Sequence, residues 1–240
     1  MEFGFVLAVG LIAGTVSGII GTGSSVMLVP VLVLAFGPKE AVPIMAIAAL
    51  MANVARIMTW WREVDWRAVA IYGAAAAPAA ALGAGTLVIL PARLIDGALG
   101  GFFILMIPLR RWLAASAMTI RPWQLALAGA VIGYLTGVVV STGPISVPVF
   151  LAYGLVKGAF LATEAAGSLA IYVAKVATFR ELGALPSEVI GKGVITGASL
   201  MAGSFIAKWF VLRLNPDSFR LMMDGLMLVS GLTLLWTALH

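Results

Sequence analysis

The sequence contains no cysteine, and its single histidine is the final residue, His240. Disulfides, thiol catalysis and cysteine-ligated metal sites are therefore excluded, and a terminal histidine is a poor candidate for catalysis. Charged residues are also scarce, at 10%, whereas a typical soluble domain has roughly 25%. HExxH motifs, paired-acid motifs and ATP-binding loops are missing. The sequence thus predicts neither an enzyme nor an ATP-driven pump, and it predicts no metal or cofactor.

The chain contains long runs without any charged residue, and 62% of its residues are hydrophobic. The first run extends from Phe3 to Pro38, and the second from Pro122 to Val156. About 20 apolar residues suffice to cross the hydrocarbon core of a bilayer, so each run exceeds one crossing. We therefore expect an all-α, polytopic membrane protein. The net charge of +5 comes from singly scattered basic residues, which fits a positive-inside bias rather than nucleic-acid binding.

The first run is interrupted near its middle by small and hydroxyl-bearing residues that are poor in a helix interior. These residues are Gly21, Thr22, Gly23, Ser24 and Ser25. We expect one helix from Phe3 to Ile20 and a short helix from near Ser24 to about Phe36. Further segments are expected at about 41–60, 68–90 and 94–109.

The second run is interrupted in the same way, by Gly137-Val-Val-Val-Ser-Thr-Gly-Pro-Ile-Ser-Val-Pro148. A short helix is expected from near Ile145 to Val156. Paired interrupted hydrophobic segments in two halves of a chain are the best sequence indicator of a transporter's binding site.

The two halves match in order along the chain, at an offset of 118 or 119 positions. The matched pairs are Gly10 and Gly129, Gly14 and Gly133, Gly18 and Gly137, Pro30 and Pro148, Asn53 and Tyr172, and Arg56 and Lys175. The sequence therefore predicts two homologous five-segment repeats, at residues 1–118 and 119–240, each with a broken helix and one short helix. The stripes of glycine are interpreted as sites of close helix packing.

Loop charges predict the orientation of the repeats. The loops near Arg62 and between Arg110 and Arg121 are the most basic of the first half, and the loop near Arg213 is more basic than that near Arg180. Since basic loops remain in the cytoplasm, matched loops would lie on opposite sides and the repeats would be inverted. A parallel duplication with four spans in each half is the alternative.

The breaks are predicted to form an anion site. A helix N-terminus presents unpaired N–H groups and about half a positive charge, so it holds an anion without a full counter-charge. In an inverted repeat the two short helices would point at one shared site. The residues expected to bind substrate there are Gly21, Thr22, Gly23, Ser24, Ser25, Ser141, Thr142, Gly143 and Ser146. The alternative is that these residues only kink and pack the helices.

Ionisable residues inside a membrane are costly and are candidates for function. Arg56 and Lys175 would attract or hold the anion, with Asn53 and Tyr172 on the same helix faces, unless the two cations reach to the interface instead. Glu164 would carry a coupling proton. Asp96 and Asp224 are interpreted as favourable charges near helix starts.

The glycine- and hydroxyl-rich pattern of the first break and its weaker repeat resemble the TauE/SafE family of sulfite exporters over essentially the whole chain. The residues that carry the resemblance are Gly14, Gly18, Gly21, Thr22, Gly23, Ser24, Ser25 and Pro30, followed by Gly133, Gly137, Ser141, Thr142, Gly143, Pro144 and Pro148. The resemblance implies a multi-pass carrier of the bacterial inner membrane. It would export sulfite or an organosulfonate such as sulfoacetate, driven by the proton gradient.

Two other functions remain open from the residues: an anion channel, and a carrier of another small organic anion. A purely structural subunit is disfavoured, because a scaffold has no need of duplicated breaks that carry hydroxyls. The expected partners are a small anionic substrate and the lipid bilayer, with homo-oligomerisation left open.

Overall fold

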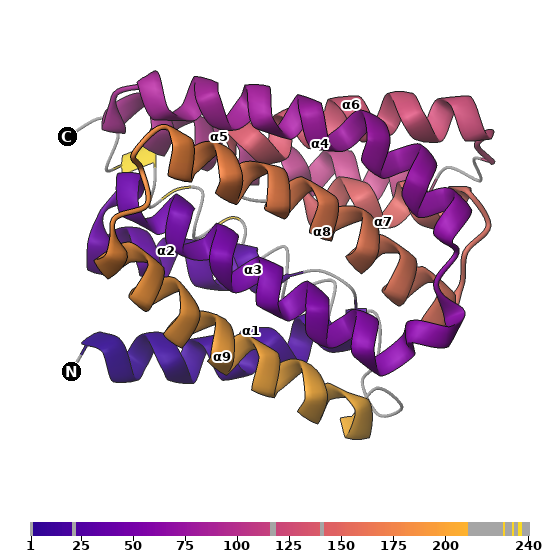
Figure 1. Cartoon of the computed structure of the whole chain (residues 1–240), viewed down its shortest axis with the longest axis horizontal. Helices are drawn as coiled ribbons and strands as arrows, with labels where there is room; N and C mark the ends of the chain where they lie inside the picture. The colour runs from indigo at the N-terminus through magenta and orange to yellow at the C-terminus, as the bar shows by residue number, and fades with distance from the viewer. Residues whose placement is uncertain are drawn as a thin grey trace.

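A computed structural model describes residues 2–20, 23–115, 119–139 and 142–210, together with positions 228, 232, 235 and 236. Within these residues the chain forms α-helices and one 3-10 turn, with no strand (Figure 1). The helices are α1 Glu2–Ile20, α2 Ser24–Phe36, α3 Pro38–Trp60, α4 Trp66–Ile89, α5 Ala92–Ala115, α6 Pro122–Val138, α7 Gly143–Ala152, α8 Lys157–Glu181 and α9 Ser187–Phe210, with the 3-10 turn η1 at Trp61–Glu63.

The predicted breaks are confirmed where the structure describes them. Helix α1 ends at Ile20 and α2 begins at Ser24, as expected. Helix α7 begins at Gly143, earlier than predicted, because a proline in the first helical turn is compatible with a helix start. It also ends earlier, since the chain turns at Gly154, whose φ of 100° is left-handed. The predicted end of α5 near 109 was wrong, as that helix continues to Ala115.

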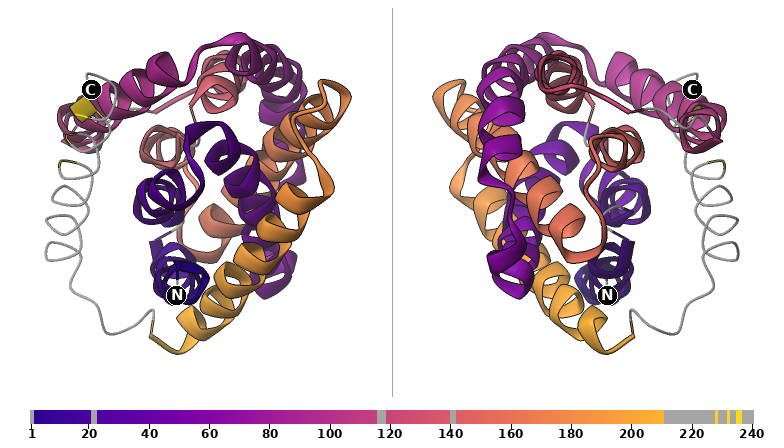
Figure 2. Two further views of the ribbon diagram at one scale, coloured as in Figure 1. Left: turned by 90° about the vertical axis from the view of Figure 1, so that its left-hand side faces the viewer. Right: turned by 90° about the vertical axis from the view of Figure 1, so that its right-hand side faces the viewer.

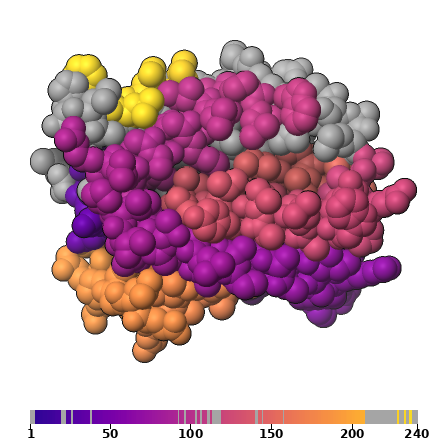
Figure 3. All heavy atoms as spheres, turned by 90° about the horizontal axis from the view of Figure 1, so that it is seen from above, coloured from indigo at the N-terminus to yellow at the C-terminus, as the bar shows by residue number. Residues whose placement is uncertain are grey.

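The helices and the outer surface suit a lipid bilayer. Four helices, at Lys39–Glu63, Trp66–Ile89, Gly158–Glu181 and Ser187–Ala207, are long and apolar enough to cross a membrane, and shorter apolar helices accompany them. Large apolar side chains face outward from α4 and α6, including Leu82, Ile89 and Leu127. Figure 3 shows the face of the molecule on which these two helices lie. The prediction of an all-α, polytopic membrane protein is confirmed.

Each interrupted helix packs against a helix of the other half. Helix α1 lies along α9, and α6 lies along α4; Figure 2 shows α9 running diagonally along the outside of the bundle. A Cβ atom added at Gly14 would lie 2.2 Å from the carbonyl oxygen of Leu200, and one at the matched Gly133 would lie 2.2 Å from that of Ala76. Only glycine allows these backbones to approach so closely, so the two stripes are sites of tight helix packing.

The same contacts give the directions of the helices. Gly10 meets Ser199 and Gly18 meets Ala207, so α1 and α9 are parallel. In α9, Gly193 and then Gly197 meet successive residues of α3, so these two helices are also parallel.

The second set of helices follows the same rule. Helix α6 is parallel to α4, because Gly129 meets Tyr72 and Gly137 meets Ala80. Helix α8 is also parallel to α4, because Gly167 contacts Tyr72 and Gly73 contacts Ala170.

Helices α3 and α8 run in opposite directions across the centre of the bundle. The backbone N–H of Asp65, just beyond the end of α3, donates to the hydroxyl of Thr163 near the start of α8. At the opposite end, Lys39 and Phe179 line the same cavity. Helices α1, α3 and α9 therefore point one way, and α4, α6 and α8 point the other.

Candidate functional site

One buried polar cavity, of about 30 Å³, lies where the two helix breaks meet α3 and α8. On that scale it holds roughly two waters. Its walls come from both halves of the chain, with small, hydroxyl-bearing and charged side chains in the majority. The lining residues are Ser17, Gly23, Ser24, Ser25, Ala49, Ala52, Asn53, Arg56, Ile132, Thr136, Thr142, Gly143, Ser146, Glu164, Ser168, Ile171 and Tyr172.

The N-termini of both short helices open onto this cavity. Helix α2 starts after Gly23, whose φ of 111° is left-handed and favours glycine, and α7 starts after Thr142. The N-cap residue Thr142 makes no side-chain hydrogen bond that caps α7, and Gly23 has no side chain to cap α2. The first N–H groups of a helix have no partner within the helix and carry its positive dipole end. Two such ends at one cavity produce a positive potential without a formal charge.

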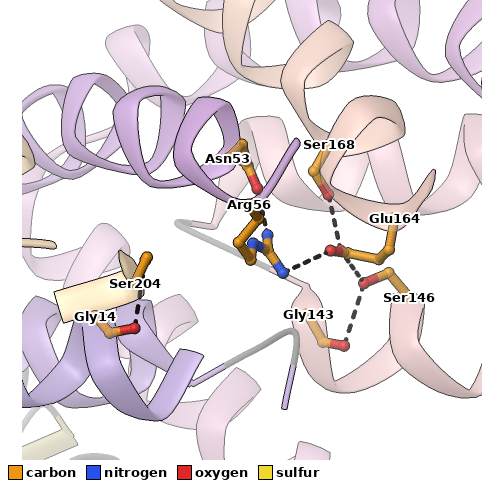
Figure 4. A network of polar contacts seen from close by, with 8 residues as sticks. All are labelled: Gly14, Asn53, Arg56, Gly143, Ser146, Glu164, Ser168 and Ser204. Carbon is orange, nitrogen blue, oxygen red and sulfur yellow. Dashed lines mark hydrogen bonds and ion pairs between the residues drawn. The ribbon is translucent and has the colours of Figure 1, made fainter. Parts of the chain in front are cut away.

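A buried ion pair spans the cavity from α3 to α8 (Figure 4). The Nη1 atom of Arg56 lies 3.0 Å from Oε2 of Glu164, and both side chains are almost fully buried. The other terminal nitrogen of Arg56 donates to Oδ1 of Asn53, one turn earlier on the same helix. The guanidinium is thereby fixed from both sides.

The second carboxylate oxygen of Glu164 is held by hydroxyls. Ser146, in the first turn of α7, and Ser168, one turn further along α8, each donate to Oε1 over 2.9 Å. Figure 4 shows the two serines reaching the carboxylate from different directions, Ser168 from above and Ser146 from below, while Arg56 approaches from the left. Since Ser146 belongs to the interrupted segment, the ion pair is connected directly to the second break.

Three polar residues of the cavity were missed by the sequence analysis: Ser17, Thr136 and Ser168. Ser17 and Thr136 stand 119 positions apart, each within the last turn of the helix before a break. The hydroxyls of Thr136 and Thr142 are hydrogen-bonded to each other across the second break. The offset of the repeat was the signal that could have found the first two.

Lys175 has a different place from its matched partner. Its ammonium group donates to the backbone carbonyls of Thr136 and Val139, the latter over 2.8 Å, and lies 5.6 Å from the centre of the Phe179 ring. These carbonyls belong to the C-terminal turn of α6, where acceptors lack helical partners and a cation opposes the negative dipole end. Lys175 therefore satisfies the end of an interrupted helix, and it does not line the cavity.

The structure brings together most of the residues predicted to form the site. Those that line the cavity are Gly23, Ser24, Ser25, Asn53, Arg56, Thr142, Gly143, Ser146, Glu164 and Tyr172. Gly21, Thr22 and Ser141 lie outside the described residues, as does Asp224. Asp96 is the fifth residue of α5, beyond its first turn, which contains no acidic residue, so the interpretation of Asp96 as a favourable charge at a helix start was wrong. That the cavity residues bind a substrate stays a prediction at this point.

The donors around the cavity suit an anion. A guanidinium, several hydroxyls and two helix N-termini donate hydrogen bonds, and Glu164 supplies the carboxylate. Over the part of the chain that the structure describes, no group of His, Cys, Asp and Glu could hold a metal ion.

Comparison with known proteins gives one match. The family model for the sulfite exporter TauE/SafE matches residues 6–234, nearly the whole chain. No curated protein and no solved structure matches. A family of membrane transporters fits the helices described above and excludes an enzymatic role. The chain belongs to the sulfite exporter TauE/SafE family and is a multi-pass transporter of a small anion.

Proposed function

We propose that the protein binds a sulfur oxyanion or a small organosulfonate in the cavity between the two breaks and exports it across the membrane. One observation carries this proposal: the N-termini of α2 and α7 converge with the guanidinium of Arg56 on a single buried cavity. Broken helices whose positive ends face an anionic group are the usual form of a transporter's anion site.

The substrate class follows from the donors and from the family. A sulfite or sulfonate head has three oxygens on one centre, which accept hydrogen bonds from hydroxyls and backbone N–H groups in several directions. Ser24 and Ser25 from the first break, and Thr142 from the second, line the cavity and supply hydroxyls to such a group.

We also propose that residues 1–118 and 119–240 form two inverted repeats. The support is the exchange of partners: α1 packs on α9 and α6 on α4, while the matched helices α3 and α8 run in opposite directions. In an inverted repeat, rocking of one half against the other opens a central site to each side in turn. The bacterial inner membrane is the location that fits such a carrier.

Proton coupling through Glu164 completes the proposal. It is the one carboxyl group in the described wall of the cavity, and it contacts both the predicted anion ligand Arg56 and the second break. A carboxylate buried at a transporter's central site is a common carrier of a coupling proton. A channel would need no such group.

Binding to the purified protein tests the site. Sulfite, sulfoacetate, thiosulfate, sulfate, acetate and chloride are compared for the rise in melting temperature that ligand binding to the folded state produces. We expect a rise with sulfite or a sulfonate, lost when Ser24 and Ser25 are both replaced by Leu. The control Ser187→Leu, at the exposed start of α9, should retain the rise. A response to no sulfur anion, or to carboxylates alone, would refute the proposed substrate class.

Uptake into proteoliposomes tests the transport itself. Vesicles are loaded with sulfite, and a pH gradient is imposed across their membrane. The rate of sulfite movement should depend on that gradient in the wild type and depend on it less in Glu164→Gln. Anion flux at channel-like rates, insensitive to pH, would favour the channel instead.

A further inference from the structure

We propose that the substrate anion displaces the Glu164 carboxylate from Arg56, and that Glu164 then takes up one proton, so the site accepts a singly charged anion together with a proton. This inference rests on the proposed function and deepens it, since it names the exchange at the site and the charge of the substrate. Because anion and proton would move together, the anion's own outward gradient drives export, and the inward proton gradient that the family resemblance implies as the driving force would oppose it. Its physical basis is the ion pair that crosses the cavity.

The guanidinium of Arg56 is the only formal positive charge among the described residues of the cavity wall. This guanidinium is paired with the carboxylate of Glu164, with 3.0 Å between Nη1 and Oε2. An anion that enters the cavity meets the two helix N-termini and this already paired cation. Binding with full use of Arg56 therefore requires the anion and the carboxylate to compete for one partner.

Arg56 can change partner without being released. Its other terminal nitrogen is held by Asn53 of the same helix, so the guanidinium keeps one fixed hydrogen bond while Nη1 turns from the carboxylate to the anion. An arginine anchored in this way stays close to its rotamer and delivers the same charge to either partner.

Charge balance decides what happens to Glu164. The empty site holds one positive and one negative charge. A monoanion bound to Arg56 beside an ionised Glu164 would leave one uncompensated buried charge, which is strongly unfavourable. Transfer of one proton from water to Oε2, the oxygen that Arg56 vacates, restores neutrality and forms one O–H bond. Oε1 keeps its two serine donors throughout.

Among the described residues of the cavity wall, Glu164 is the one carboxyl group, and Arg56 pairs with it directly. From α4, the hydroxyl of Tyr72 lies close enough to interact with its charge, and α8 adds Tyr172 further along the cavity wall. Helices α2 and α7 contain no acidic or basic residue. Lys175 is engaged with the carbonyl groups at the end of α6. The proposal therefore assigns the proton to Glu164, the carboxyl group that Arg56 vacates.

The same balance predicts selectivity by charge. A singly charged sulfonate or hydrogensulfite, taken with one proton, leaves the cavity neutral. A dianion such as sulfate would leave one net negative charge even with Glu164 protonated, so the site should reject it. Size alone would not separate these tetrahedral and pyramidal anions.

Titration calorimetry with methanesulfonate, which stays singly charged near neutral pH, tests the proposal. Binding is measured in two buffers of different ionisation enthalpy, and the difference gives the protons taken up per anion. Sulfite is measured in parallel, with the proton of hydrogensulfite subtracted. We expect uptake of about one proton by the wild type and by Glu181→Gln, an exposed carboxyl change at the end of the same helix.

The variant Glu164→Gln should bind the anion at least as tightly as the wild type, because the competitor for Arg56 is gone, and should take up no proton. Gln keeps an oxygen for the two serines but leaves Arg56 without its buried counter-charge, so the anion-free variant should melt at a lower temperature and recover when the anion binds. Binding by the wild type without proton uptake, or unchanged uptake by Glu164→Gln, would overturn this inference and leave the proposed function standing. No binding of any sulfur anion would overturn both.

Discussion

Arg56 and Lys175 occupy matched positions in the two halves, and both are buried, yet they do different work. Arg56 lies in the cavity wall and forms an ion pair with Glu164 across the two halves. Lys175 binds the carbonyl groups at the end of α6 and stays outside the cavity. Each break thus has a buried cation at the matched position, but the partner of that cation differs between the two halves.

The divergence has a simple origin in the sequence. The position that matches Glu164, 119 residues earlier, is Met45, which is buried in the apolar core. Only the second half supplies a carboxylate to the described cavity wall, and it pairs with the cation of the first half. The two breaks are similar in sequence, but only one half supplies an acidic residue. The site is therefore asymmetric, with the cation Arg56 in the first half and its carboxylate partner Glu164 in the second.

Replacing Arg56 with Met should have the largest effect. It leaves Glu164 buried without its counter-charge, and breaking one side of a buried ion pair costs about 3–5 kcal/mol. We expect a clear fall in melting temperature and loss of binding of sulfur anions, measured on purified protein in detergent.

The double variant Arg56→Met, Glu164→Gln separates the two effects. With no charge left unpaired, the melting temperature should recover most of its loss, whereas binding should remain absent because the cation is missing. Recovery of binding in the double variant would mean that Arg56 serves the fold and not the anion.

The second test asks whether the two glycine stripes are equivalent. An added methyl group at Gly14 or at Gly133 meets a carbonyl oxygen at 2.2 Å, so each Ala variant must push its helix pair apart. Overpacking of this kind costs about 1–3 kcal/mol, and we expect similar falls in melting temperature for both variants. Gly85→Ala in α4, with open space around the added carbon, is the control and should lose little or nothing. Unequal falls in melting temperature for Gly14→Ala and Gly133→Ala would show that the two stripes are not equivalent in packing.

Much of this arrangement was readable from the sequence because the signals are local. Glycine, serine and threonine clustered within an apolar run predict a broken helix whatever surrounds it, and α2 begins at the expected Ser24. The matched offset of 119 predicted which positions belong together. The breaks and most of the cavity residues could therefore be predicted before any contact was known.

The partners of the two cations could not be predicted, because they depend on packing between distant segments. Glu164 pairs with Arg56 from α3, a contact between segments more than 100 residues apart in the sequence. Nothing local to Lys175 indicates that it reaches the carbonyls of α6, since that contact requires the two helices to cross at that level. The sequence showed that both buried residues are cations, but it did not show which groups they contact.

Replacing Lys175 with Met tests its structural role directly. The carbonyls of Thr136 and Val139 would lose their buried donor, and an unsatisfied buried acceptor costs about 1–3 kcal/mol. We expect a lower melting temperature with anion affinity changed by less than about twofold, since Lys175 does not line the cavity. Thr178→Val, one turn along α8 and bonded only within its own helix in the contacts described, is the matched control. Loss of affinity with an unchanged melting temperature would return Lys175 to the anion site predicted from the sequence.

The smallest expected effect is that of Ser168→Ala, which probes the carboxylate rather than the cations. Ser168 and Ser146 each donate to the same oxygen of Glu164, so removing one leaves the other in place, at a cost of about 0.5–1.5 kcal/mol. Hydrogen bonds to a charged group are stronger than those to a neutral one, so the lost hydroxyl stabilised the ion-paired carboxylate more than the displaced one. The variant should therefore bind the anion slightly more tightly than the wild type, by less than about tenfold, measured by calorimetry on the purified protein. Weaker binding by the variant would mean that Ser168 donates to the anion itself.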